Sequence, residues 1–297
     1  MLDPETLYTL DDAVLARVQR TQPVLVYLLE GFVDAGQVTH RTSQHLRDAC
    51  SPTELVRFDH DQLHDYRSRR PQMVFDTNQW VGLTDFRLAI DVATDERGEP
   101  FLLLTGPEPD TQWERMAAAV LGLAERLNVR QMVTVSGVPM GVPHTRPVLL
   151  THHATDPDLA PSNPVWIDRV HIPGSFAGML EYRAGHRDLL ARGFVAHVPH
   201  YLAQGVFDPA VLAVLRKVNE TTGLHLPLEA IEQSGSNALA SLESEVNEDA
   251  ELVALVGALE QQYDELEQKG AAAVPSPDEI GAAVERFLAE QDRPDEA

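Results

Sequence analysis

Two acidic side chains beside glycines follow the first strongly apolar run of the chain. The run covers residues 24–29 and leads into the motif EGFVDAG, which contains Glu30, Gly31 and Asp34. Two carboxylates that face each other across a cleft can act as a general acid and a general base. Asp34 can also accept the free backbone N–H groups of a helix that extends to about Asp48, and this helix cap is the simpler interpretation. The motif is therefore a candidate site, and a purely structural role as a helix cap is the alternative for Asp34.

The glycine spacing of this motif suggests a phosphate-binding loop but does not complete one. Gln37 and Val38 follow Gly36, where a P-loop requires lysine and then serine or threonine. No strand is followed by G-x-G-x-x-G, so the common dinucleotide-binding signature is also missing. We therefore expect no cofactor.

The segment at residues 136–147, with the sequence SGVPMGVPHTRP, is the second candidate site. Its two glycines allow close approach to the backbone, and its three prolines stiffen it. A loop with a purely structural role would not need this composition, so we interpret the segment as a ligand- or partner-binding loop, with a structural role as the alternative. The residues expected to take part are Gly137, Gly141, His144, Thr145 and Arg146.

Nucleophile and metal chemistry have less support. Ser136 and His144 could belong to a catalytic triad, but Ser136 lacks the G-x-S-x-G elbow that presents such a serine. His152 and His153 are adjacent on an expected strand, so they point to opposite faces and cannot easily bind one ion. Cys50 is the single cysteine, which excludes an internal disulfide and a thiolate metal cage. We expect no metal site.

Buried strands must position the two candidate segments. Residues 24–29 are apolar without polar alternation, which is typical of a strand covered on both faces in a parallel sheet. The runs at 101–104 and 131–135 are similar, and the tight turn at 95–98 predicts an antiparallel pair within a mostly parallel sheet. The expected architecture is a three-layer α/β/α sandwich. Further strands are expected at 54–58, 88–92, 148–151 and 194–198, and helices at 34–48, 111–128 and 175–192.

The two candidate segments follow two strands that we expect to be central and parallel. The carboxyl ends of such strands lie at one edge of the sheet, where open α/β proteins usually bind ligands. We therefore expect Glu30, Asp34 and the loop 137–146 to line one crevice, with Arg146 as the donor and the carboxylates as acceptors. An internal pair between Arg146 and a carboxylate is the structural alternative.

The chain is predicted to be helical after about Asp208. Helical patterns cover residues 208–222 and 228–268, and one short helix is expected to end near Gln291. We expect a sandwich domain at residues 1–205 and an acidic helical section at 206–297 with a flexible end. This section is expected to have its own small core, built from Val211, Leu212, Leu215, Leu252, Leu255 and Leu259.

The charge of the chain excludes several kinds of partner. The 297 residues carry a net charge of −23, and residues 229–297 alone hold 18 acidic and three basic side chains. A strongly negative field disfavours both nucleic acid and anionic membranes. No apolar run approaches the roughly 20 residues that span a bilayer, and the acidic start MLDPETLYTLDD does not resemble a secretory signal. We expect a cytoplasmic protein.

Three motifs occur in order along the chain: EGFVDAG at 30–36, GPEPDTQW at 106–113 and GVPMGVPHTRP at 137–147. This combination resembles the proteasome assembly chaperone 2 family, and in particular its actinobacterial branch, over about residues 5–235. The resemblance implies an α/β/α sandwich related in fold to the nucleoside phosphorylases, followed by a helical C-terminal section. It also implies a non-enzymatic chaperone role, which is that of the eukaryotic members, whereas bacterial members are commonly labelled only as family members or as ATP-dependent carboxylate–amine ligases. Oligomers are common in the resembled families, so we expect self-association, with a homotrimer as the first choice.

Two classes of function therefore remain. The first is a binding or assembly protein that holds a protein partner, and we favour it. The second is an enzyme on a small anionic or nucleoside-like substrate, such as an ATP-dependent carboxylate–amine ligase or a phosphorylase-like enzyme. The chain has only two lysines, Lys217 and Lys269, and both belong to the helical C-terminal part. Nucleotide-dependent ligases usually hold phosphates with lysines, so the second class has weaker support, although arginines could substitute.

Overall fold

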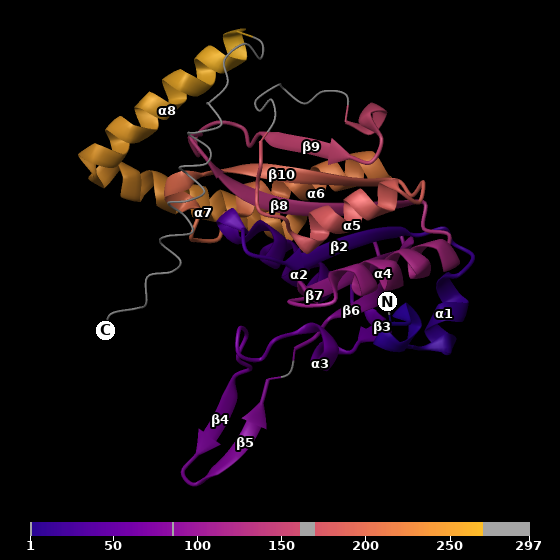
Figure 1. Cartoon of the computed structure of the whole chain (residues 1–297). Helices are drawn as coiled ribbons and strands as arrows, with labels where there is room; N and C mark the ends of the chain where they lie inside the picture. The colour runs from indigo at the N-terminus through magenta and orange to yellow at the C-terminus, as the bar shows by residue number, and fades with distance from the viewer. Residues whose placement is uncertain (1, 85, 161–169, 270–297) are drawn as a thin grey trace.

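The computed structural model describes residues 2–84, 86–160 and 170–269, and an eight-stranded sheet lies at its centre (Figure 1). The strands follow the order β1-β3-β6-β7-β2-β8-β10-β9. Five of them point one way, and β1, β6 and β9 point the other way. The bounds are β1 (Tyr8–Leu10), β2 (Val24–Glu30), β3 (Thr53–Phe58), β6 (Ala89–Thr94), β7 (Pro100–Pro107), β8 (Gln131–Met140), β9 (Leu150–Ala154) and β10 (Ala191–Pro199).

The three strands with continuously apolar sequences are neighbours at the centre of this sheet, as predicted. β2 pairs in parallel with β7 on one side and with β8 on the other. Residues 24–29 are all buried, because helices cover both faces of the strand and leave no position for a polar side chain. The predicted antiparallel pair is formed by β6 and β7.

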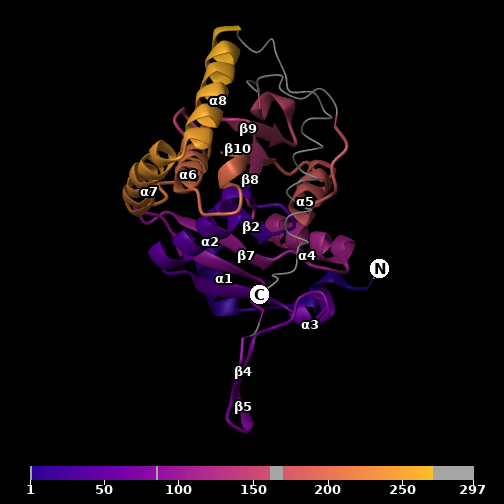
Figure 2. The same cartoon turned by 90° about the vertical axis from the view of Figure 1, so that its left-hand side faces the viewer.

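Helices cover both faces of the sheet, which confirms the three-layer sandwich (Figure 2). One face packs against α1 (Asp12–Val18), α4 (Trp113–Arg126) and α5 (Phe176–Gly185). The other packs against α2 (Val38–Ala49) and α6 (Asp208–Thr222), and α7 (Glu229–Glu248) lies on α6. None of the helices in the described ranges is both long enough and apolar enough to cross a bilayer.

The first helix after Asp208, α6, belongs to the sandwich itself. Val211 and Leu215 of α6 are fully buried in the same cluster as Val26 and Val133 of the sheet. The prediction of a separate C-terminal core is therefore wrong for these two residues, because the apolar stripe of α6 faces the sheet. The division of the chain into residues 1–205 and 206–297 stays a prediction.

Several expected boundaries differ from the structure. α5 ends at Gly185, and the next residues lead into β10 instead of continuing the helix. The expected helix at 228–268 is two helices, α7 and α8 (Ala250–Lys269). Asp249 separates them, because its backbone is extended and its carboxylate accepts a 2.8 Å hydrogen bond from the N–H of Glu251. The short helix and flexible end expected near Gln291 lie outside the described residues.

A β-hairpin that the sequence did not predict projects away from the sandwich (Figures 1 and 2). It consists of β4 (Met73–Asp76) and β5 (Gln79–Leu83), which pair only with each other in the described chain. Its large apolar side chains are 49% to 63% exposed: Met73, Val74, Phe75, Trp80, Val81 and Leu83. An isolated two-stranded hairpin is marginally stable in water, and exposed apolar patches are typical of interaction surfaces.

Candidate functional site

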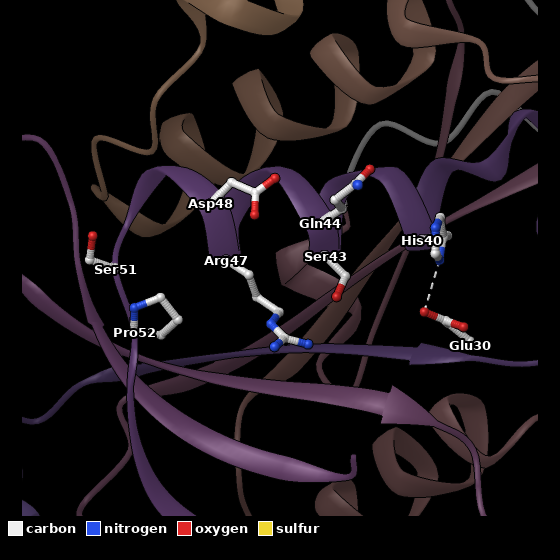
Figure 3. Close-up of a pocket in the computed structure, with 8 residues that line it drawn as sticks. All are labelled: Glu30, His40, Ser43, Gln44, Arg47, Asp48, Ser51 and Pro52. Atoms are coloured by element: carbon white, nitrogen blue, oxygen red, sulfur yellow. Dashed lines mark hydrogen bonds and ion pairs between the residues drawn. The ribbon is translucent and has the colours of Figure 1, made fainter. Parts of the chain in front are cut away.

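Glu30 ends β2 and lines a pocket beside α2 (Figure 3). Its Oε1 atom lies 2.9 Å from Nδ1 of His40, which belongs to the first turn of α2. The pocket has a volume of about 570 Å³. Its other lining residues come from α2 and the turn that follows it: Ser43, Gln44, Arg47, Asp48, Ser51 and Pro52. This pocket, which we call the α2 pocket, therefore combines polar groups from one stretch of chain with the end of β2.

Asp34 fixes the start of α2. Its two carboxylate oxygens accept hydrogen bonds from the backbone N–H groups of Thr39 and His40, at 2.8 and 3.0 Å. Burial raises the pKa of Asp34, while these two hydrogen bonds oppose that shift. Both carboxylate oxygens of Asp34 therefore accept hydrogen bonds from the first turn of α2, as a helix-capping residue does.

Gly31 makes room for a buried carboxyl group that the sequence analysis did not select. A Cβ atom on Gly31 would lie 3.2 Å from the carboxyl carbon of Glu108, and Oε2 of Glu108 accepts a 2.9 Å hydrogen bond from the N–H of Phe176. Burial raises the pKa of Glu108. Glu108 thus joins the ends of β2 and β7 to the start of α5. Its position directly after a buried strand, within GPEPD, is the signal that could have identified it.

Gly137 lies within a strand and not in a loop. β8 continues to Met140 and pairs with β10 from Met132 to Met140, so the expected loop at 136–147 begins only at Gly141. β8 pairs with β2 only as far as Val133, so beyond that point Pro139 has a neighbour on one side only and its missing N–H is tolerated. A Cβ atom on Gly137 would lie 2.1 Å from the carbonyl oxygen of Ala35. Gly137 therefore lets β8 pack against the turn before α2.

The remaining part of the loop is held by α8. The Nε and Nη2 atoms of Arg146 donate to the two carboxylate oxygens of Asp264, each at 2.8 Å, and Nη1 donates to Glu260 at 2.9 Å. Thr145 also donates to Glu260, and the hydroxyl of Tyr263 donates to the carbonyl oxygen of Pro147 at 3.1 Å. Arg146 lowers the pKa of Asp264 in this pair. Loop and helix are therefore joined by a bidentate ion pair with Asp264, by two hydrogen bonds to the carboxylate of Glu260 and by one neutral hydrogen bond from Tyr263.

His144 is held by Tyr201, which belongs to the short turn of helix after β10 (His200–Leu202). The hydroxyl of Tyr201 accepts a 3.0 Å hydrogen bond from its backbone N–H and lies 2.6 Å from Nδ1 of its ring. Burial lowers the pKa of the imidazole, so its neutral form is favoured. The loop is thus fixed at two successive positions, to Tyr201 by His144 and to α8 by Thr145.

The two candidate segments line different cavities of the structure, and the charge partners of Arg146 are not Glu30 or Asp34. His144 and Arg146 line a separate groove of about 460 Å³ between β9 and α6, which does not include Glu30 or Asp34. Arg146 pairs with Glu260 and Asp264 on α8, which are 114 and 118 residues away in sequence. We call this second cavity the β9–α6 groove. Its full lining is His144, Arg146, Pro147, Val148, Leu150, Pro209, Leu212, Ala213, Arg216, Lys217, Glu220 and Leu239.

Arg146→Ala should release α8 without unfolding the sandwich. The substitution removes three hydrogen bonds to Glu260 and Asp264, whereas none of the described side chains of α8 belongs to the two large core clusters of the sandwich. We expect faster amide hydrogen exchange throughout residues 250–269 and an almost unchanged midpoint of thermal unfolding. Arg183→Ala is the matched control, because it removes a surface pair with Glu114 on the far side. Unchanged exchange in α8 would show that Tyr263 and its apolar neighbours hold the helix alone.

The adjacent histidines point to opposite faces, as the strand pattern predicts. Nδ1 of His153 lies 2.9 Å from both carboxylate oxygens of Glu181 on α5, whereas the ring of His152 packs edge-on against Phe194 toward α6. Among residues 2–84, 86–160 and 170–269, no group of three histidine, cysteine or acidic side chains could hold a metal ion.

Comparison with known proteins identifies the group to which this fold and these segments belong. Residues 28–250 match the model of the PAC2 family. A protein of unknown function from Mycobacterium tuberculosis shares 39% sequence identity, with 97% of each chain covered and a TM-score of 0.84. Another protein of unknown function, from Corynebacterium glutamicum, shares 34% identity over 89% of this chain and 98% of its own, with a TM-score of 0.82.

A third similar structure also comes from Mycobacterium tuberculosis. A proteasome-assembly chaperone homologue from Mycobacterium tuberculosis shares 25% identity, with 78% of this chain and 99% of that chain covered and a TM-score of 0.71. No curated protein matches the sequence. The resemblance noted from the three motifs, including its actinobacterial character, is thereby confirmed. The family model covers most of the chain, and the chain belongs to the PAC2 family.

Proposed function

We propose that this protein is a non-enzymatic binding protein that assists the assembly of other polypeptides, with proteasome subunits as the first partners to test. The observation that carries the proposal is the family match over residues 28–250, together with the similarity to a proteasome-assembly chaperone homologue. The site geometry agrees with it, because Asp34, Arg146 and Glu108 are engaged by the protein's own groups. Of the residues expected to bind, Glu30, His144 and Arg146 line cavities, and with Gly141 and Thr145 of the same loop they remain the candidate binding residues. Gly31, Asp34 and Gly137 make internal structural contacts instead.

An enzymatic role on a nucleotide has little support in this geometry. Lys217 is the only lysine whose side chain the structure describes, and it lines the β9–α6 groove at 2.8 Å from Glu220. The α2 pocket contains one arginine, Arg47. Two acidic residues, Glu30 and Asp48, line the same pocket, and its histidine, His40, pairs with Glu30. A polyphosphate needs several converging cations or backbone N–H groups. We further place the protein in the cytoplasm, in keeping with its single buried cysteine, Cys50.

The assembly role can be tested with purified components. Native mass spectrometry of the full chain mixed with proteasome α and β subunits from the same organism should show a complex. Arg146→Ala should weaken it while the melting temperature stays level, if the loop and α8 together form the binding surface. Arg183→Ala should leave it unchanged. A chain that forms no complex with either subunit would remove proteasome assembly as the function.

We also propose that the protein is a homo-oligomer, with a trimer as the first choice, and that the β4–β5 hairpin holds it together. The segment 72–84 contains one ionisable side chain, Asp76, although the chain carries a net charge of −23. Like-charged copies repel one another over most of their surfaces. An uncharged apolar hairpin is the region where self-association costs least.

The double substitution Phe75→Ser and Trp80→Ser should dissociate this oligomer. The two rings pack edge-on with centroids 4.9 Å apart and are 55% and 63% exposed, so their loss removes surface that only a partner could bury. The molar mass measured by light scattering should fall from a multiple of 32.8 kDa to 32.8 kDa, the mass of one chain. Val206→Ser, at another exposed apolar position, is the control. A single-chain mass for the unaltered protein would end the proposal.

A further inference from the structure

The β4–β5 hairpin has two faces of different composition. Neighbouring residues of a strand point to opposite faces, and residues paired across two strands share a face. Met73 is paired with Leu83 and Phe75 with Trp80, and Met73 and Phe75 are two positions apart on β4. The register shifts by one residue on β5, which brings Trp80 and Leu83 to the same side although they are three positions apart. We call this set, Met73, Phe75, Trp80 and Leu83, the apolar face of the hairpin.

The opposite face carries smaller side chains and the one charge. Val74 is paired with Gly82, and Asp76 with Gln79. A Cβ atom on Gly82 would lie 3.2 Å from Cγ2 of Val74, so the side chain of Val74 lies over the backbone of Gly82. Asp76 is the one ionisable residue in the segment 72–84. This division arises from the pairing register, so it does not appear as an alternation in the sequence.

The apolar face is uncovered in the single chain. Its four side chains are 49% to 63% exposed, and the hairpin projects away from the sandwich (Figure 2). A two-stranded hairpin gains independent stability when more strands are added to it or when another element packs on its hydrophobic side. The face therefore requires a partner that presents an apolar surface to it.

A second copy of this chain presents a surface of that kind. The apolar face carries no charge, whereas the whole chain carries −23. The hairpin is about 16 Å long, and surface charges are screened beyond roughly 8–10 Å at physiological salt. Copies that are joined at their hairpins therefore keep much of their acidic surface apart, and the contact avoids most of the repulsion between like charges.

The area of the apolar face favours three copies over two. Four large side chains at this exposure leave about 450 Å² of accessible surface. Two such faces would bury at most about 900 Å², which is below the roughly 1,200 Å² of a stable standard interface. Three faces could bury about 1,350 Å², which reaches that range.

We propose that the apolar faces of three copies pack around a common axis and form one shared core. This inference rests on the proposed self-association and specifies its contact. Val74 and Asp76 point outward to water, and the three sandwiches lie outside the shared core. A closed ring of three leaves no apolar face uncovered.

Chemical cross-linking of full-length variants tests the face and the number of copies together. Cys50 is the single cysteine and is buried, so a cysteine added to the hairpin is the reactive one. A three-armed maleimide reagent should join Leu83→Cys into covalent trimers on a denaturing gel, because the three thiols meet near the axis. Val74→Cys is the matched control, since Val74 is 57% and Leu83 60% exposed, and it should give at least tenfold less trimer.

Two aspartate substitutions provide a second measurement. Leu83→Asp places three like charges in the shared core, so the molar mass from light scattering should fall from three chains to one. Val74→Asp adds the same charge to the outer face and should leave the mass unchanged. Trimers formed through Val74→Cys, or a Leu83→Cys product that stops at two chains, would overturn the proposal. So would equal effects of the two aspartate substitutions.

The inference and the self-association on which it rests fail separately. A mass of three chains for the unaltered protein, without cross-linking through Leu83→Cys, would keep the trimer and place its contact elsewhere. A mass of one chain for the unaltered protein would remove self-association itself, and the hairpin contact with it. Neither outcome bears on the complex with proteasome subunits, which is a separate measurement.

Discussion

Gly137→Ala should lower the free energy of unfolding by about 3 kcal/mol, although it adds a single methyl group. A Cβ atom at this position would lie 2.1 Å from the carbonyl oxygen of Ala35 and 2.9 Å from a methyl group of Val38. The nearest atom belongs to the backbone of the turn before α2, which is itself hydrogen-bonded through Gly36 to Ala203. Neither β8 nor the turn can move without disturbing the sheet, so the strain is not easily relieved.

Gly122→Ala is the matched control for this experiment. Gly122 lies inside α4 with no atom within 4 Å of the added Cβ, so the substitution should raise stability by about 0.5–1 kcal/mol. Urea unfolding followed by circular dichroism measures both variants. Equal small effects for Gly137 and Gly122 would mean that β8 is not packed against the turn as the structure shows.

Leu215→Ala is the second large change, with an expected loss of about 3 kcal/mol. Leu215 is fully buried between α6 and the sheet, and the surrounding residues of the sandwich cannot collapse into the cavity. Because α6 shares one core with the sheet, tryptophan fluorescence and circular dichroism should report one unfolding transition, shifted as a whole. The cost should therefore appear in the stability of the entire sandwich.

Leu212→Ala on the same helix should cost about 1 kcal/mol, since Leu212 is only partly buried. Two separate transitions, of which only the one belonging to the C-terminal helices moves with Leu215→Ala, would contradict the shared core. That outcome would instead support the division of the chain at residues 205 and 206.

The centre of the fold is predictable from the sequence because its signals are local. Residues 24–29, 101–104 and 131–135 are strands in the structure, and their lack of polar alternation follows directly from burial on both faces. α6 was also recognised as a helix, but its apolar stripe could not reveal whether it faced a sheet or another helix. Periodicity gives the buried side of an element and not the identity of its neighbour.

The candidate site depended on contacts that have no local signal. Arg146 was expected to face Glu30 and Asp34, but carboxylates of α8 more than a hundred residues away hold it. Gly137 was interpreted as a place for ligand approach, whereas its own turn occupies that space. The hairpin at 73–83 was missed for a different reason. Its apolar residues have no core to face, so the sequence shows no division into an inner and an outer side.

The position of α6 in the core has a consequence for how the chain is made. The helices α2 and α6 cover one face of the sheet. α6 begins roughly seventy residues after the end of β8, the last of the three central strands to be synthesised. At typical rates of translation, the ribosome needs several seconds to add that stretch. During this interval the growing chain holds Val26, Leu103 and Val133 on a half-covered face. Until α6 is synthesised, the nascent chain therefore exposes an apolar face that general cellular chaperones can bind.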